Sequence, residues 1–293
     1  VDIDEDLFII EAPAHLYAVH HMAEPLLQQG QFDEALKIFQ KIYKSQKQKH
    51  GGDTHYHVGS ALHNIGVVQL WAGRFKEALQ SFRSASRVRF QTLKSDHPDV
   101  AVSLIKLGTA FFALNQYSEA IESFNRALKI ANAIISFYTN NASHTANSNN
   151  NHCQHQQALL TKAKVLNNIG CVHFQKRQYS VSMSTFLAAL EIQRQWLGDC
   201  ADAREGDGVV SNTPSSTRGR REFSTVFDAS ICLNNLGRVY IEMKDWDMAI
   251  VVCEEAHELQ RNVFQRRHPI VVMSTCNIKY AKSNLPGATI AAF

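Results

Sequence analysis

Two stretches of sequence decide the fold, GRFKEALQSF at residues 73–82 and NQYSEAIESF at residues 115–124. In both, an aromatic residue is followed three positions later by Ala and four positions after that by Phe. Spacings of three and four residues place these side chains on one face of an α-helix. Small residues at that spacing let two backbones approach closely, so each stretch predicts a helix that packs tightly against another helix.

The same pattern occurs five times along the chain. The aromatic positions are Phe32, Phe75, Tyr117, Tyr179 and Trp246. A small residue lies nine positions before each aromatic, at the end of segments such as LHNIG (62–66) and LNNLG (233–237), which place Leu and Ile on one helix face. Each unit is therefore predicted to be a helical hairpin with one apolar face. Such a face is buried only when neighbouring hairpins stack, which predicts a solenoid.

These columns resemble the tetratricopeptide repeat, with a small residue, an aromatic, Ala, Phe and Ala in the expected order. The first three aromatics are 43 and 42 residues apart, which is longer than the usual period of about 34 residues. A 42-residue period also fits HEAT and armadillo repeats, but those lack the Ala–Phe–Ala columns. The linker SDHPDVAVSLIKLG (95–108) is similar to the repeat linker of kinesin light chains, as is LNNLG (233–237). The resemblance implies an all-α, right-handed superhelical solenoid of stacked helical hairpins.

The repeats divide the chain into a core and its additions. The solenoid is predicted over residues 14–282, with about five repeats and a terminal helix at 268–282. The last two intervals between aromatics lengthen to 62 and 67 residues. The extra residues are polar and poor in apolar side chains, so disordered insertions are predicted near 138–156 and 199–222. Residues 1–13 form an acidic segment that is expected to be disordered, and 283–293 a tail.

Composition excludes several classes of protein. The net charge of +3 is too small to indicate a polyanionic partner, and no apolar run approaches the roughly 20 residues of a membrane helix. The six cysteines include no CxxC pair and are predicted to be reduced thiols in a cytoplasmic protein. No catalytic grouping or phosphate-binding glycine loop is present, so neither enzymatic activity nor a cofactor is expected. Nucleic-acid and membrane binding are not expected either.

Three short patterns suggest alternative sites. A zinc site could be built from His144, His152, Cys153 and His155, but the flanking Asn runs favour a low-complexity loop. A kinase-recognition site could be built from Arg218, Arg220 and Arg221 ahead of Ser224 and Thr225, although a solvated loop is the commoner explanation. A basic stripe comprises Lys37, Lys41, Lys44, Lys47 and Lys49. It can contact an acidic partner, but such a stripe is more often the solvated face of an amphipathic helix.

The candidate binding site follows from the resemblance, which implies that the first helix of each hairpin lines a concave face. On this face, the residues two positions before the Gly of the last four repeats are Asn64, Lys106, Asn168 and Asn235. An amide side chain both donates and accepts, so it can bridge the N–H and C=O of an extended peptide. Adjacent columns add Lys164, Asn167, Asn234 and Arg238, together with His63 and aromatic residues such as Phe174. Alternatively, the Asn residues make hydrogen bonds between neighbouring repeats.

The function expected from these features is a non-catalytic scaffold or adaptor, similar to the cargo-binding part of a kinesin light chain. Its partner is expected to be a protein or peptide with acidic and aromatic residues, bound in the groove without a metal. The alternative is a regulatory repeat region of a larger enzyme or signalling ATPase.

Overall fold

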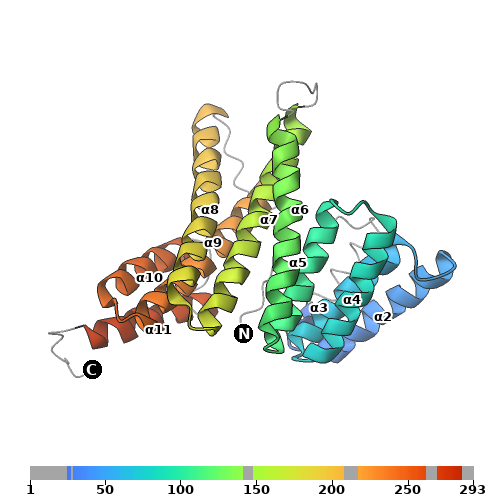
Figure 1. Ribbon diagram of the computed structural model, residues 1–293, viewed down its shortest axis with the longest axis horizontal. Coiled ribbons are helices and arrows are strands. Elements are labelled where there is room, and N and C mark those ends of the chain that lie inside the picture. The colour runs from blue at the N-terminus through green and yellow to red at the C-terminus, as the bar shows by residue number, and fades with distance from the viewer. Residues whose placement is uncertain (1–24, 28, 141–147, 208–216, 262–268, 286–293) are drawn as a thin grey trace. The chain divides into compact units, whose positions relative to one another are not determined.

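The computed structural model describes residues 25–27, 29–140, 148–207, 217–261 and 269–285. Every regular element within these ranges is an α-helix, which confirms the all-α prediction. The helices, labelled as in Figure 1, are α2 (Phe32–Lys49), α3 (Tyr56–Trp71), α4 (Phe75–Thr92), α5 (Pro98–Ala113), α6 (Tyr117–Asn140), α7 (Ser148–Gln175), α8 (Tyr179–Asp207), α9 (Thr217–Glu242), α10 (Trp246–Arg261) and α11 (Pro269–Asn284).

The chain divides into two compact units, which meet in the sequence at residues 144 and 145. Unit 1 contains α2 to α6, and unit 2 contains α7 to α11 (Figure 1). The hairpins predicted from the repeats are the pairs α3–α4, α5–α6, α7–α8 and α9–α10, each packed along its length. Within each unit, contacts such as α4 with α5 and α8 with α9 join one hairpin to the next. Each unit is therefore a stack of helical hairpins.

A glycine packs against a phenylalanine in three of the four hairpins, and in the fourth Gly237 packs against Cys253. A Cβ atom at Gly108 would lie 2.5 Å from Cε1 of Phe124, and one at Gly170 would lie 2.6 Å from Cε1 of Phe186. Both rings are almost fully buried. Because no Cβ fits between the helices, these glycines are required for close approach rather than for flexibility. The columns that predicted tight helix packing therefore have that role in the structure.

The turn inside each hairpin repeats the same backbone geometry. The residue two positions before each aromatic has positive φ, and these residues are Gly30, Gly73, Asn115, Arg177 and Lys244. In the fourth turn, the N–H of Arg177 donates to the carbonyl of Phe174, and the N–H of Gln178 donates to that of His173. This pair of hydrogen bonds is a Schellman motif, which satisfies carbonyls at the end of the first helix.

Histidines in the linkers begin two of the first helices. Nδ1 of His55 accepts a hydrogen bond from the N–H of His57 at 3.3 Å, and Nδ1 of His97 accepts one from the N–H of Asp99 at 3.1 Å. Each thereby satisfies an amide that the helix itself leaves without a partner. His55 and His97 therefore act as helix-capping residues in these two repeats.

The insertions differ from the prediction of disordered loops. Helix α6 runs on to Asn140 and α7 begins at Ser148, while α8 runs on to Asp207 and α9 begins at Thr217. Residues 138–140, 148–156, 199–207 and 217–222 are therefore helical, and only 141–147 and 208–216 lie outside the described residues. The polar composition of the insertions did not exclude a helix, because a helix that is already nucleated can extend without adding core contacts. The first insertion also contains no Gly or Pro that would stop α6 early.

The described residues cover only part of the two chain ends. Helix α11 spans Pro269–Asn284, so it includes residues 269–282 of the predicted terminal helix and the first two residues of the predicted tail. The acidic segment 1–13 and residues 286–293 lie outside the described residues. In the parts of the chain that the structure describes, no helix is both long and apolar enough to cross a lipid bilayer.

Candidate functional site

In unit 1 the predicted groove residues are divided between the core and the surface. His63 on α3 is 1% exposed and packs edge-on against the ring of Phe82, with 5.6 Å between centroids. Burial, and then the charges of Arg89 and Lys106, hold the pKa of His63 well below its usual value, so it is neutral. Asn64 is 6% exposed. The placement of His63 in a groove was wrong, and Asn64 offers little surface to a ligand.

A buried arginine that the sequence did not single out organises the neighbouring part of unit 1. Arg89 on α4 is 1% exposed, and its Nη1 donates to the Oγ of Ser103 at 2.7 Å and to the carbonyl of Asp99 at 3.2 Å. The Asp99 carboxylate in turn accepts a hydrogen bond from the hydroxyl of Tyr56 at 2.8 Å. Arg89 therefore ties α4 to α5 and has a structural role.

The signal for this arginine lay in the repeat alignment. Seven residues after the core Phe or Cys, the other units carry Gln46, Ala131, Gln193 and Gln260. All three glutamines are buried, and Gln260 accepts a hydrogen bond from Ser274, which stands in the same position as Ser103. A long polar residue at this column thus links neighbouring helices at Arg89 and at Gln260.

In unit 2 the predicted residues meet along one face formed by α7 and α9. We call this the α7–α9 face, and its three cross-helix contacts follow one another along the two helices. Nζ of Lys164 lies 3.2 Å from Oδ2 of Asp228. Nδ2 of Asn235 donates to Oδ1 of Asn167 at 3.1 Å. Positions 164, 167, 171 and 174 share one face of α7 because of the helical period, which explains why these contacts are aligned.

The third contact pairs a cation with an aromatic ring. The guanidinium carbon of Arg238 lies 4.9 Å from the centroid of Phe174, whose ring is tilted against Tyr179 at 5.8 Å. Arg238 is exposed, while Phe174 is half-buried. A guanidinium held over an aromatic face loses little further freedom when it binds a carboxylate. This end of the α7–α9 face therefore presents an exposed, preoriented cation.

The Asn residues of the α7–α9 face have different surroundings. Asn235 links α9 to α7, as the repeat-to-repeat alternative expected, and its Nδ2 also lies 3.5 Å from Sγ of Cys171. Burial raises the pKa of Cys171 to about 12, so the thiol is neutral there. Asn234 is fully buried, and among the described residues neither its Oδ1 nor its Nδ2 has a hydrogen-bond partner. Its assignment to the groove was wrong, whereas Asn168 is half-buried and retains surface.

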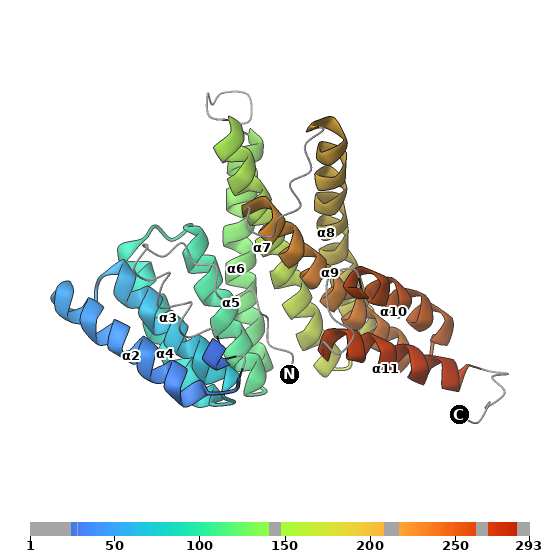
Figure 2. The ribbon, with the colours of Figure 1, turned by 180° about the vertical axis from the view of Figure 1, so that it is seen from behind.

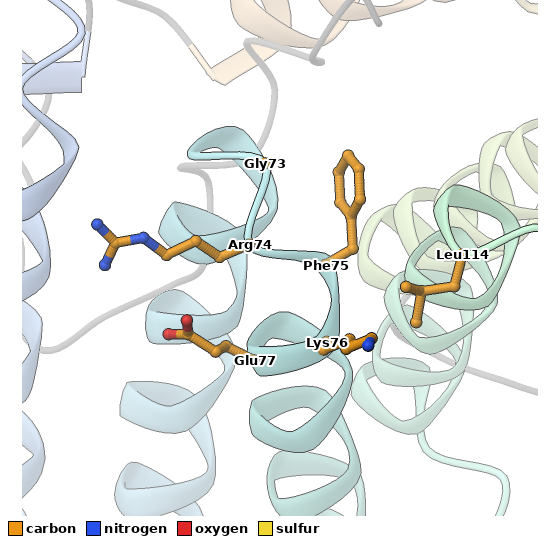
Figure 3. Close-up of a pocket in the computed structure, with 6 residues that line it drawn as sticks. All are labelled: Gly73, Arg74, Phe75, Lys76, Glu77 and Leu114. Atoms are coloured by element: carbon orange, nitrogen blue, oxygen red, sulfur yellow. The ribbon is translucent and has the colours of Figure 1, made fainter.

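A shallow depression lies elsewhere, beside the turn between α3 and α4 (Figure 3). The ring of Phe75 and the side chain of Leu114 lie to one side of it, while Arg74 extends to the other (Figure 3). Arg74 contacts Asp33 on α2 at 2.6 Å, and Glu77 accepts a hydrogen bond from Gln69. The side chains of Arg74 and Glu77 are thus already engaged within unit 1, and Lys76 is the third charged residue that lines the depression.

The predicted zinc and kinase-recognition sites gain no support from the structure. Within the described residues, no group of three His, Cys, Asp or Glu side chains is arranged to hold a metal ion, and His144 lies outside those residues. Thr225 is 1% exposed on α9, which makes it a poor kinase substrate. The basic stripe on α2 is exposed throughout, and Lys47 within it contacts Asp53 at 2.6 Å.

Comparisons with known proteins agree with the repeat architecture. Models described as tetratricopeptide repeat match residues 15–89, 57–133, 163–195 and 231–270. No curated protein matches the chain.

Solved structures share the fold at low sequence identity. The structure of BtubC (BKLC) from P. vanneervenii is 15% identical with a TM-score of 0.54, covering 91% of this chain and 85% of that one. The apo form of RapI is 13% identical with a TM-score of 0.55, covering 96% of this chain and 63% of that one. A putative kinesin light chain of Podosopora anserina with TPR-like repeats is 18% identical, with a TM-score of 0.46 and coverages of 86% and 98%.

Proposed function

Because this chain belongs to the tetratricopeptide repeat family, we propose that it is a non-catalytic scaffold that holds an extended peptide on the α7–α9 face of unit 2. Repeats of this family serve protein–protein interaction, and here the binding surface would be the α7–α9 face, with a cation, an aromatic ring and an amide as the recognising groups. The observation that carries it is the exposed Arg238 held over Phe174 beside the half-buried Asn168. These three residues combine a cation, an apolar surface and an amide within one face.

Each of these groups would recognise a different part of a peptide. The Asn168 amide would bridge the backbone of an extended chain, which needs a donor and an acceptor at every second residue. Arg238 would bind an Asp or Glu side chain, and the edge of Phe174 would contact an apolar or aromatic side chain. Lys164 is already paired with Asp228, so it would help an acidic ligand less. An acidic and aromatic peptide therefore fits this face best.

A kinesin-light-chain-like adaptor role is the finer part of the proposal. It is supported by the 42-residue spacing and by the linker at 95–108, which resembles the linkers of that family. In unit 1, Lys106 is half-buried at the corresponding column and would offer a second cationic position. Asn64, being nearly buried, is expected to contribute to folding instead.

Three variants separate binding from folding when melting and peptide affinity are measured on the same protein. The ligands would be peptides selected by display against the whole chain. Asn168→Ala should weaken the binding of every peptide by about 1 kcal/mol, because it removes one contact to the peptide backbone. It should not change the melting temperature. Arg238→Glu should act on acidic peptides and lose its effect at high salt. Asn235→Ala should instead lower the melting temperature, because Asn235 bonds to Asn167.

The control is Lys279→Glu, which reverses an exposed charge on α11. It should change neither melting nor affinity. Unchanged binding by a stably folded double variant of Asn168→Ala and Arg238→Glu would place the peptide elsewhere and end the proposal.

A further inference from the structure

Three helices of unit 1 share an unusual arrangement of charge. Most of the length of α2, α4 and α6 carries cations as its only charged residues: residues 36–49, 78–92 and 123–140 contain no Asp or Glu, although Glu122 is exposed in the second turn of α6. We call seven of these exposed residues the basic band: Lys37, Lys41, Lys44, Arg83, Arg87, Arg126 and Lys129. Among the described residues, none of the seven takes part in an ion pair. The first turns of the same helices are acidic, with Asp33, Glu34, Glu77 and Glu119.

Side-chain contacts connect α2 with α4 at their first turns, and α4 with α6 within the band. Arg74, at the start of α4, contacts Asp33 in the first turn of α2 at 2.6 Å. The guanidinium of Arg126 on α6 lies 5.3 Å from the ring centroid of Phe90 on α4. The helices of unit 1 are seen from a second direction in Figure 2. The exposed faces of α2, α4 and α6 thus adjoin, and the band crosses all three.

The fold does not require this charge pattern. A helix dipole favours cations in the last turn only, whereas Lys37 and Arg83 lie in earlier turns. In unit 2, the corresponding part of α10 carries Glu254, Glu255 and Glu258. The band is therefore a property of unit 1. Glu34 and Glu122 lie one helical turn before Lys37 and Arg126, whereas the other five cations have no carboxylate one turn away on their own helix, so they repel one another. A bound anionic group would relieve that repulsion.

We infer that the acidic N-terminal segment, residues 1–11, binds across the basic band of unit 1. This segment, VDIDEDLFIIE, carries Asp2, Asp4, Glu5, Asp6 and Glu11 and no Lys or Arg, so its charge complements that of the band. It is also tethered to unit 1 by the chain itself, which raises its effective concentration. The inference concerns a different surface from the α7–α9 face and does not depend on peptide binding there.

The dimensions of the band suit a single chain. The three helices belong to successive hairpins of unit 1, and ten extended residues span about 33 Å. The acidic first turns limit the band along the helix direction, so a bilayer or a nucleic-acid duplex laid on it would also meet Glu77 and Glu119. A narrow extended segment that lies over the later turns would avoid these first-turn carboxylates. The apolar residues Leu7 to Ile10 would then lie beside the band rather than on it.

The test measures binding of the segment in trans to the full chain. The receptor is the full chain with Asp2→Asn, Asp4→Asn, Glu5→Gln and Asp6→Asn, so that its own segment no longer competes. The probe is a fluorescent synthetic peptide of residues 1–13 with the natural sequence, and anisotropy is measured at low and at high salt. Saturable binding that weakens with salt is expected, and the chain with its natural segment should bind the probe more weakly.

Charge reversal on the band should abolish that binding. Lys41→Glu, Arg87→Glu and Lys129→Glu change one residue per helix, and none of the three makes a cation–aromatic contact. Introduced into the receptor together, these three substitutions should lower its affinity for the probe at least about tenfold, because attraction becomes repulsion at three positions. The matched control reverses exposed cations of unit 2 through Lys176→Glu, Arg261→Glu and Lys279→Glu, and should leave affinity unchanged.

Several results would overturn the inference. Absence of saturable probe binding, or equal binding by the band variant and the control, would do so provided that both variants melt like the receptor. Loss of probe binding in Arg238→Glu would assign the acidic segment to the α7–α9 face. Displacement of the probe by a short oligonucleotide or by anionic vesicles at lower concentration than by unlabelled peptide would assign the band to those polyanions.

Discussion

At the scale of single residues, the turn inside each hairpin gives the sharpest test. Arg177 has a φ of 57° in the column where Gly73 has 72°. A side chain costs about 1 kcal/mol in this left-handed conformation, and glycine avoids that cost. We expect Arg177→Gly to raise the free energy of unfolding by up to about 1 kcal/mol and Gly73→Ala to lower it by a similar amount. Urea denaturation measures both, and a loss of stability in Arg177→Gly would contradict the strain argument.

At the scale of elements, the long N-terminal extension of α7 is the main departure from a regular repeat. Replacing residues 148–156 by a Gly/Ser link of equal length should lower the helical signal in circular dichroism, because this stretch is helical. The melting temperature should change little, because residues such as His152 and Gln154 are exposed. An Ala-rich replacement of the same length is the control and should keep the helical signal. An unchanged signal with the Gly/Ser link would mean that the stretch is a loop.

At the scale of the whole molecule, each unit is expected to respond to damage in its own core. Phe82 in unit 1 and Phe186 in unit 2 are both almost fully buried against a hairpin glycine. Phe82→Ala and Phe186→Ala should each cost about 3–5 kcal/mol. Stacked repeats contact only their neighbours, so hydrogen exchange should accelerate most in the helices of the altered unit. Equal acceleration throughout the chain in both variants would show that the two units unfold as one.

The sequence determined the helical hairpins because their signals are local. The aromatic, Ala and Phe columns recur at helical spacing, and a glycine such as Gly170 faces the Phe186 that lies sixteen positions later in the same hairpin. The turn before each aromatic likewise depends on one residue with positive φ. Insertion boundaries were less predictable, since polar residues continue a helix as readily as they form a loop.

Only the tertiary structure decided which polar residues remain available for binding. Asn167, Asn168, Asn234 and Asn235 are equally polar in the sequence, yet Asn234 is buried, Asn235 bonds to Asn167 across two helices, and Asn168 keeps surface. Neighbouring positions on a helix differ by about 100° in direction, so the packing of the next helix determines which of these side chains are buried and which remain exposed. For the same reason, only the packing of α4 on α5 identified Arg89 as a buried link.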